Sequence, residues 1–128
     1  MRVIGTKTHG YLDYTVGLLL IVAPWLLGFY KGGAETWVPV ILGVGTLVYS
    51  LWTDYPLGMA KVIPMKTHLI LDLVNGILLA ASPWLFGFAD YIRAPHLVLG
   101  IVEIVVVLMT KQTSGEGRTG RRRTIPVH

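Results

Sequence analysis

The 128-residue sequence contains no cysteine, which excludes disulfide bonds, thiolate nucleophiles and cysteine-ligated metal sites. Charged residues are also scarce, at 14% of the chain against about 25% in soluble domains. The sequence has no phosphate-binding glycine loop, no nucleophile–base motif and no cofactor fingerprint. We therefore expect a protein that is not an enzyme and that carries no cofactor.

Long segments without Lys, Arg, Asp or Glu make up much of the chain. Three of them cover residues 14–30, 36–53 and 73–89, and a fourth, 94–110, is interrupted only by Glu103. Each approaches the length of about 20 residues that a helix needs to cross a bilayer. We predict transmembrane helices over residues 8–29, 36–53, 67–88 and 95–110, with Thr8 and Thr67 as N-caps.

The first half of the chain is repeated in the second half. Lys7-Thr8-His9, Asp13, Gly17, Pro24-Trp25-Leu26 and Gly28-Phe29 recur 59 positions later as Lys66-Thr67-His68, Asp72, Gly76, Pro83-Trp84-Leu85 and Gly87-Phe88. A fainter match at an offset of 57 pairs Gly43 with Gly100, Thr46 with Glu103, and Thr53 with Thr110. Such a period indicates a duplicated supersecondary unit. The predicted fold is all-α, an integral membrane four-helix bundle of two tandem helical hairpins that start on the same side of the membrane.

The boundaries and the orientation follow from the loops. We divide the chain into a hairpin over residues 7–53, a linker over 54–66, a second hairpin over 67–110 and a basic, disordered tail over 111–128. Nine of the 11 Lys and Arg residues fall on the side of the linker and the termini. The positive-inside rule places that side in the cytoplasm, which predicts a multi-pass protein of the cytoplasmic membrane. The basic residues are not interleaved with aromatic residues, so nucleic acid is not an expected partner.

Each copy has a His-x-x-x-Asp helix that closes on a (Ser/Ala)-Pro-Trp-Leu-x-Gly-Phe turn. The motif residues are Ala23, Pro24, Trp25 and Gly28 in the first copy, and Ser82, Pro83, Trp84 and Gly87 in the second. This pattern resembles the SPW repeat family of small prokaryotic integral membrane proteins, over roughly residues 7–110. The resemblance implies a four-helix membrane domain and no particular activity.

The motif also makes local predictions. Each proline removes a backbone hydrogen bond near the outer end of its helix, and the Ser82 hydroxyl could donate to a carbonyl freed in this way. The aromatic residues at this depth fit an interfacial belt, namely Trp25, Phe29, Tyr30, Trp84 and Phe88.

At helical spacing, polar and small residues share one face of each repeated helix. The two faces carry His9, Asp13, Gly17, Pro24 and Gly28, and His68, Asp72, Gly76, Pro83 and Gly87. We expect these faces to lie against protein, because membrane helices associate through small residues and interhelical hydrogen bonds. Each His–Asp pair has three interpretations: a structural hydrogen bond within its helix, part of a four-residue proton or ligand site, or a metal site. We favour the structural bond.

Glu103 is the one ionisable residue deep in a predicted span, and an intramembrane carboxylate is by default a candidate functional group. A neutral side chain that bonds a hydroxyl or carbonyl on a neighbouring helix is the structural alternative, which we favour.

Three functions remain open. The first is a non-enzymatic structural or interaction module that contacts the lipid bilayer, other membrane proteins or further copies of itself. The second is a small transporter or a proton or cation conductor, which requires a polar path from Glu103 to the His/Asp residues. The third is a metal- or haem-binding accessory protein with His9 and His68 as ligands.

Overall fold

The computed structural model describes residues 3–111. Within this range lie four α-helices: α1 (Thr6–Leu26), α2 (Ala34–Leu51), α3 (Met65–Leu85) and α4 (Ala94–Met109). The remaining regular pairings of these residues are two isolated bridges, Ile4 with Thr110 and Thr53 with Ile63. The described chain is therefore all-helical with four helices, as predicted. The tail predicted to be disordered lies outside the described residues, apart from Lys111.

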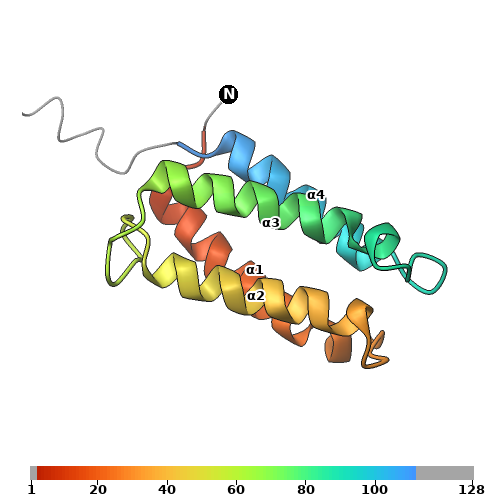
Figure 1. Ribbon diagram of the computed structural model, residues 1–128. Helices are drawn as coiled ribbons and strands as arrows, with labels where there is room; N and C mark the ends of the chain where they lie inside the picture. Colours follow the sequence, from red (N-terminus) through yellow and green to blue (C-terminus); the bar gives the residue numbers. More distant parts are fainter. Residues whose placement is uncertain (1–2, 112–128) are drawn as a thin grey trace, which may run out of the picture.

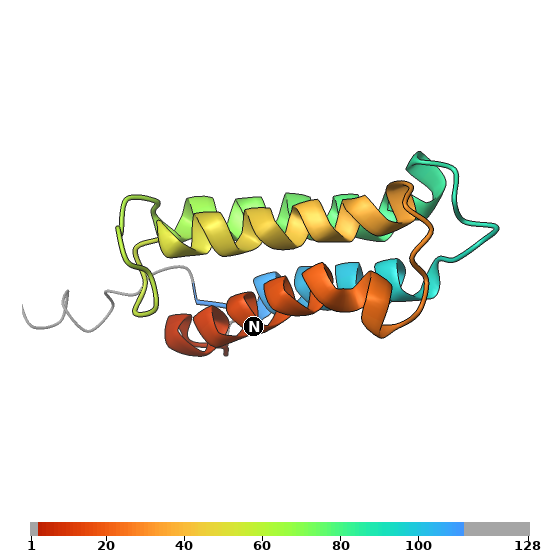
Figure 2. The ribbon, with the colours of Figure 1, turned by 90° about the horizontal axis from the view of Figure 1, so that it is seen from below.

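The four helices lie side by side in one bundle (Figure 1). α1 packs along α2, α3 packs along α4, and α2 also contacts α3. The views in Figures 1 and 2 together place α1 diagonally opposite α3, and these two helices start at the same end of the bundle. We call this end the linker end, because residues 52–64, which join α2 to α3, lie there. The end of α4 lies at the same end. The opposite loop end carries residues 27–33 and 86–93.

Paired glycines bring the helices of each neighbouring pair close together. A Cβ atom on Gly43 of α2 would lie 2.6 Å from the carbonyl oxygen of Gly17 on α1. A Cβ atom on Gly100 of α4 would likewise lie 2.6 Å from the carbonyl oxygen of Gly76 on α3. The glycines of each predicted face therefore lie at the contact between α1 and α2 and at the contact between α3 and α4. Small residues at these positions allow the two backbones to approach closely.

α1 and α3 each begin two residues earlier than predicted. Thr8 and Thr67 consequently lie inside the first turn, and their prediction as N-caps is wrong. The N-cap positions belong to Gly5 and Pro64, which are extended (ψ 159° and 150°) and make no side-chain capping bond. The reason is tertiary: the residue before each of them is held in a backbone bridge, so the chain enters both helices from a fixed extended segment.

α1 also ends earlier than predicted, because Gly28 adopts a left-handed backbone conformation with a φ of 72°. The amide of Phe29 then donates to the carbonyl oxygen of Pro24 at 3.0 Å, which is the six-to-one bond of a Schellman ending. Gly28 thus stops its helix and does not belong to the helical face on which it was predicted. The end of α3 repeats this arrangement with Gly87 (φ 75°), Phe88 and Pro83 (2.8 Å).

The serine of the second motif has the role that its sequence predicts. Pro83 has no amide hydrogen to donate to the carbonyl oxygen of Leu79, four residues earlier. The Ser82 hydroxyl donates to that same oxygen at 2.6 Å. Ala23, at the equivalent position of α1, has no hydroxyl with which to do this.

The aromatic residues of the motif separate into two groups. Trp25 and Trp84 point outward, each with 55% of its surface exposed. Phe29 and Phe88 are buried, and their rings lie 5.0 and 4.8 Å from the ring of His96. The predicted belt is therefore wrong for the two phenylalanines, because the left-handed glycine before each one turns the chain back onto the bundle.

The surface of the bundle is apolar, and its interior contains both apolar and polar side chains. Lys7 and Lys66, in the first turns of α1 and α3, are the only exposed charged residues within the four helices. Large apolar side chains are exposed along every helix, among them Leu18, Ile41, Ile70 and Val98. The side chains buried almost completely include Leu20 and Leu79, and also the polar residues His9, Thr36, Thr53, His68, His96 and Thr110. By length and composition α2 and α3 could cross a membrane, and α4 is apolar but shorter, at 16 residues.

Candidate functional site

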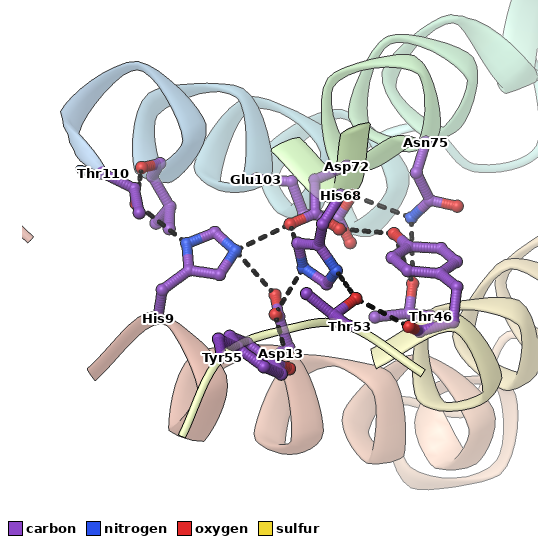
Figure 3. Close-up of polar contacts among 12 residues, drawn as sticks. His9, Asp13, Thr46, Thr53, Tyr55, His68, Asp72, Asn75, Glu103 and Thr110 are labelled. Carbon is purple, nitrogen blue, oxygen red and sulfur yellow. Dashed lines mark hydrogen bonds and ion pairs between the residues drawn. The ribbon is translucent and has the colours of Figure 1, made fainter. Parts of the chain in front are cut away.

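The two His–Asp pairs meet in one buried cluster at the linker end of the bundle, which we call the His/Asp ring (Figure 3). Between helices, His9 Nε2 of α1 lies 2.7 Å from Asp72 Oδ2 of α3. Its counterpart, His68 Nε2 of α3, lies 2.7 Å from Asp13 Oδ2 of α1. Within each helix the distance from Nε2 to the nearer carboxylate oxygen is 3.0 Å. Each imidazole therefore contacts both carboxylates.

The ring is the main polar contact between α1 and α3. The predicted pairing within each helix is present as a contact of 3.0 Å, but the hydrogen bonds of the two Nε2 atoms run between the helices, at 2.7 Å. All four side chains are buried, with Asp13 the most exposed at 6%. Buried charges are tolerated only when they are paired and hydrogen-bonded. The alternating order of the ring, imidazole next to carboxylate throughout, meets that requirement.

A threonine holds the other nitrogen of each imidazole. His9 Nδ1 lies 2.8 Å from Thr110 Oγ1, and His68 Nδ1 lies 2.6 Å from Thr53 Oγ1. The two threonine hydroxyls donate their own protons to carbonyl oxygens four residues earlier, at 2.6 and 2.7 Å. Each hydroxyl oxygen is thereby left as an acceptor, so the Nδ1 atom of each imidazole carries the hydrogen that it donates.

This tautomer restricts what can occupy the centre of the ring. With Nδ1 protonated, Nε2 of a neutral imidazole is a bare lone pair. A lone pair 2.7 Å from a carboxylate oxygen is repelled by it, so a positive species must lie between the two atoms. That species is either a second proton, which makes the imidazole an imidazolium, or a bound cation. Two imidazoliums neutralise the two carboxylates, and one divalent cation does the same.

Two tyrosines complete the surroundings of the carboxylates. The Tyr49 hydroxyl of α2 donates to Asp72 Oδ1, and the Tyr55 hydroxyl donates to Asp13 Oδ2 at 3.1 Å. Tyr55 follows α2 and lies in the segment that joins it to α3. Burial, together with the nearby Asp13 carboxylate, raises the pKa of the Tyr55 hydroxyl, so this hydroxyl remains a donor. Every member of the ring consequently has a partner outside the ring.

Glu103 of α4 reaches the ring through intermediates. Its Oε2 atom accepts a hydrogen bond from Asn75 Nδ2 at 2.9 Å, and the same amide lies 3.4 Å from Thr46 Oγ1. Thr46 Oγ1 lies 3.5 Å from the hydroxyl of Tyr49, which donates to Asp72. The polar path that the conductor hypothesis requires is therefore present.

A small cavity lies beside this path, with a volume of about 40 Å³. Its polar lining consists of His9, Asp13, Thr46, Asp72 and Glu103, and valine and leucine side chains complete the wall. This volume exceeds the roughly 10–15 Å³ that one water molecule needs, but the surface of the cavity is mostly apolar, and a buried water also requires two to four polar partners. Glu103 Oε1 is itself buried and has no hydrogen-bond partner among the described residues.

Sequence reasoning missed four side chains that surround the ring, Thr53, Thr110, Tyr49 and Tyr55, and also missed Asn75 beside Glu103. The match of Thr53 with Thr110 in the two halves was the available signal. Each threonine hydroxyl is hydrogen-bonded to the imidazole of the other half. Tyr49 and Tyr55 had no such signal. Asn75 stands where the first half has Val16, and Glu103 where it has Thr46. These two departures from the repeat contact each other, which explains why they occur together.

The fold and the site define an all-helical bundle protein with an apolar surface and a buried ring of two histidines and two aspartates. The chain belongs to the SPW repeat domain family, whose profile matches residues 7–110. Comparison with curated proteins gave no significant match, and neither did comparison with solved structures.

Proposed function

We propose that this protein is an integral membrane module in which all four helices cross the bilayer as two duplicated hairpins. The observation that carries the proposal is the surface, where only Lys7 and Lys66 are exposed charges within the helices. Soluble domains carry about 25–35% charged residues on their surface and rarely expose large apolar patches. α1 and α3, with 21 residues each, span about 31 Å, close to the thickness of a hydrocarbon core.

The proposed orientation has the linker end in the cytoplasm. Of the described basic residues, Lys7, Lys61, Lys66 and Lys111 lie at the linker end, and Lys31 and Arg93 lie at the loop end. This asymmetry follows the positive-inside rule for short loops. Both termini and the His/Asp ring are then near the cytoplasmic face.

Within the membrane we assign a non-enzymatic structural or interaction role. The glycine contacts join α1 to α2 and α3 to α4, and the His/Asp ring joins the two pairs across the diagonal. Together they make one unit that presents apolar side chains on every side, suited to lipid, to other membrane proteins or to a further copy of the chain.

The membrane topology can be tested with single cysteines, because the chain has none of its own. Met59→Cys places a thiol in an exposed position at the linker end, and Asp90→Cys places one at the loop end. In intact spheroplasts we expect a membrane-impermeant maleimide to label Asp90→Cys and not Met59→Cys. Inverted vesicles should reverse the pattern. Equal labelling of both variants, or recovery of the protein in the soluble fraction, would contradict the proposal.

A second candidate function, conduction of protons or small cations, is favoured by one specific observation. Polar contacts run from Glu103 through Asn75, Thr46 and Tyr49 to Asp72, and Glu103 and Asp72 also line the same small cavity. An intramembrane carboxylate in such a position commonly marks an ion pathway.

Liposome flux measurements test this candidate. With a potassium diffusion potential and a trapped pH-sensitive dye, wild-type protein should conduct, and Glu103→Gln should reduce the flux to that of protein-free liposomes. Asp90→Asn makes the same acid-to-amide change in an exposed loop and should conduct like wild type. Absence of flux in wild type, or full flux in Glu103→Gln, rejects conduction through this path.

A further inference from the structure

The His/Asp ring has the donor set and the convergence of a metal site. Its four side chains each offer one ligand atom, and these atoms lie within 4.8 Å of one another. Two of the donors are imidazole nitrogens and two are carboxylate oxygens. They come from two helices that the rest of the bundle holds in place, so the site does not depend on a loop.

The groups behind the ring orient its donors toward the centre. Thr110 and Thr53 accept the Nδ1 hydrogens, which leaves the Nε2 lone pairs of the two histidines facing inward. Tyr49 and Tyr55 hold the carboxylates from outside. Metal-binding histidines almost always donate their other ring hydrogen in this way, and ligating carboxylates are hydrogen-bonded in turn.

The chemistry of the donors selects the ion. Two imidazole nitrogens with two carboxylate oxygens suit Zn²⁺, whereas Ca²⁺ and Mg²⁺ prefer sites made of oxygen alone. In a tetrahedral Zn²⁺ site with bonds of about 2.0–2.1 Å, neighbouring ligand atoms are about 3.3 Å apart. The four ring contacts of 2.7 and 3.0 Å would need to open by a few tenths of an ångström, and the ligand atoms across the ring, which lie within 4.8 Å of one another, would need to move to the same separation. A haem, in contrast, would have to displace both carboxylates from between the imidazoles.

A divalent ion also satisfies the charge balance of the ring. The ring is almost fully buried and contains two carboxylates, and an uncompensated charge in such a position is costly. One Zn²⁺ ion cancels both carboxylates and replaces the two protons that otherwise lie on the Nε2 atoms. We propose that the His/Asp ring binds one Zn²⁺ ion through His9, Asp13, His68 and Asp72.

The test uses the full chain, purified without a histidine tag, stripped with a chelator and reloaded with Zn²⁺ in detergent. We expect one Zn²⁺ per chain by elemental analysis. Cobalt in place of zinc should give the visible spectrum of a four-coordinate nitrogen- and oxygen-ligated ion. This spectrum reports the coordination of the ion in the wild-type protein. It therefore tests the proposed site even where a ligand variant fails to fold.

The variants separate the ring from its surroundings. His68→Gln and Asp72→Asn should lose stoichiometric Zn²⁺. Thr110→Val, which removes only the group behind His9, should weaken Zn²⁺ binding by about 10- to 100-fold. Glu103→Gln, an acid-to-amide change beside the cavity but outside the ring, should keep one Zn²⁺.

Less than stoichiometric Zn²⁺ in wild type, an octahedral cobalt spectrum, or full binding by Asp72→Asn would overturn the proposal. Each of these outcomes is independent of the membrane topology, which the cysteine labelling tests separately.

Discussion

Replacing Asp72 with asparagine is expected to lower the free energy of unfolding by about 3–5 kcal/mol, the cost of removing one partner from a buried ion pair. Asp72 contacts both imidazoles of the His/Asp ring and also accepts the hydrogen bond of Tyr49. Without this carboxylate the two imidazoles share only Asp13, and a positive charge is left buried without compensation. Unfolding in mixtures of sodium dodecyl sulfate and a mild detergent, followed by far-ultraviolet circular dichroism, measures the difference.

The matched control for this prediction is Asp90→Asn, which changes an exposed loop carboxylate at the opposite end of the bundle. Exposed substitutions of this kind usually change stability by no more than about 0.5 kcal/mol. A cycle with His9→Gln should also show strong coupling, because His9 and Asp72 are in direct contact. If Asp72→Asn destabilised the protein no more than the control does, the contacts of the ring would not be what holds the two helix pairs together.

Adding a single methyl group at Gly43 is expected to be the other severe change. The new Cβ atom would lie 2.6 Å from the carbonyl oxygen of Gly17, and backbone cannot move aside as a flexible side chain can. α1 and α2 would have to separate along their contact, at a cost of about 1–3 kcal/mol or more for overpacking. The same detergent unfolding assay measures this loss, and size-exclusion chromatography shows whether the variant remains compact.

Gly45→Ala provides the control in the same helix, two residues away. A Cβ atom at Gly45 has no atom within 4 Å, so the identical substitution meets open space there. Because alanine favours helix more than glycine does, this variant should be as stable as wild type or slightly more stable. Equal stability of the two variants would mean that the close approach of α1 and α2 does not limit the packing.

The C-terminal ends of α1 and α3 show which features can be predicted from residues that are close in sequence. The Pro-x-x-x-Gly-Phe spacing contains the whole helix ending, since the Pro24 carbonyl, the left-handed Gly28 and the amide of Phe29 lie within six residues. We nevertheless predicted a longer helix, because helical spacing places Gly28 on the face of polar and small residues that we expected to lie against protein. The Ser82 bond was predicted correctly, because donor and acceptor belong to the same helical turn.

The helix starts and the burial of the phenylalanines required contacts between distant segments. Gly5 and Pro64 precede α1 and α3 because the chain before them pairs with residues that follow α4 and α2. Phe29 and Phe88 are buried, and the rings of both contact the ring of His96 on α4. The residue pattern along one helix predicts neither the backbone bridges before α1 and α3 nor the contacts of the two phenylalanines with α4.

The four helices, the family, and the faces on which His9, Asp13, His68 and Asp72 lie could be predicted from the sequence, because each of these depends on composition or on spacing within one helix. The tertiary structure alone decided that each histidine is closer to the aspartate of the other helix than to its own. It also decided that Thr53, Thr110, Tyr49 and Tyr55 surround the ring, and that Asn75 meets Glu103. Those contacts depend on how far each helix is rotated about its axis and shifted along it relative to its neighbours. Rotation and shift are set by packing among all four helices, including the glycine contacts, and no single segment specifies them.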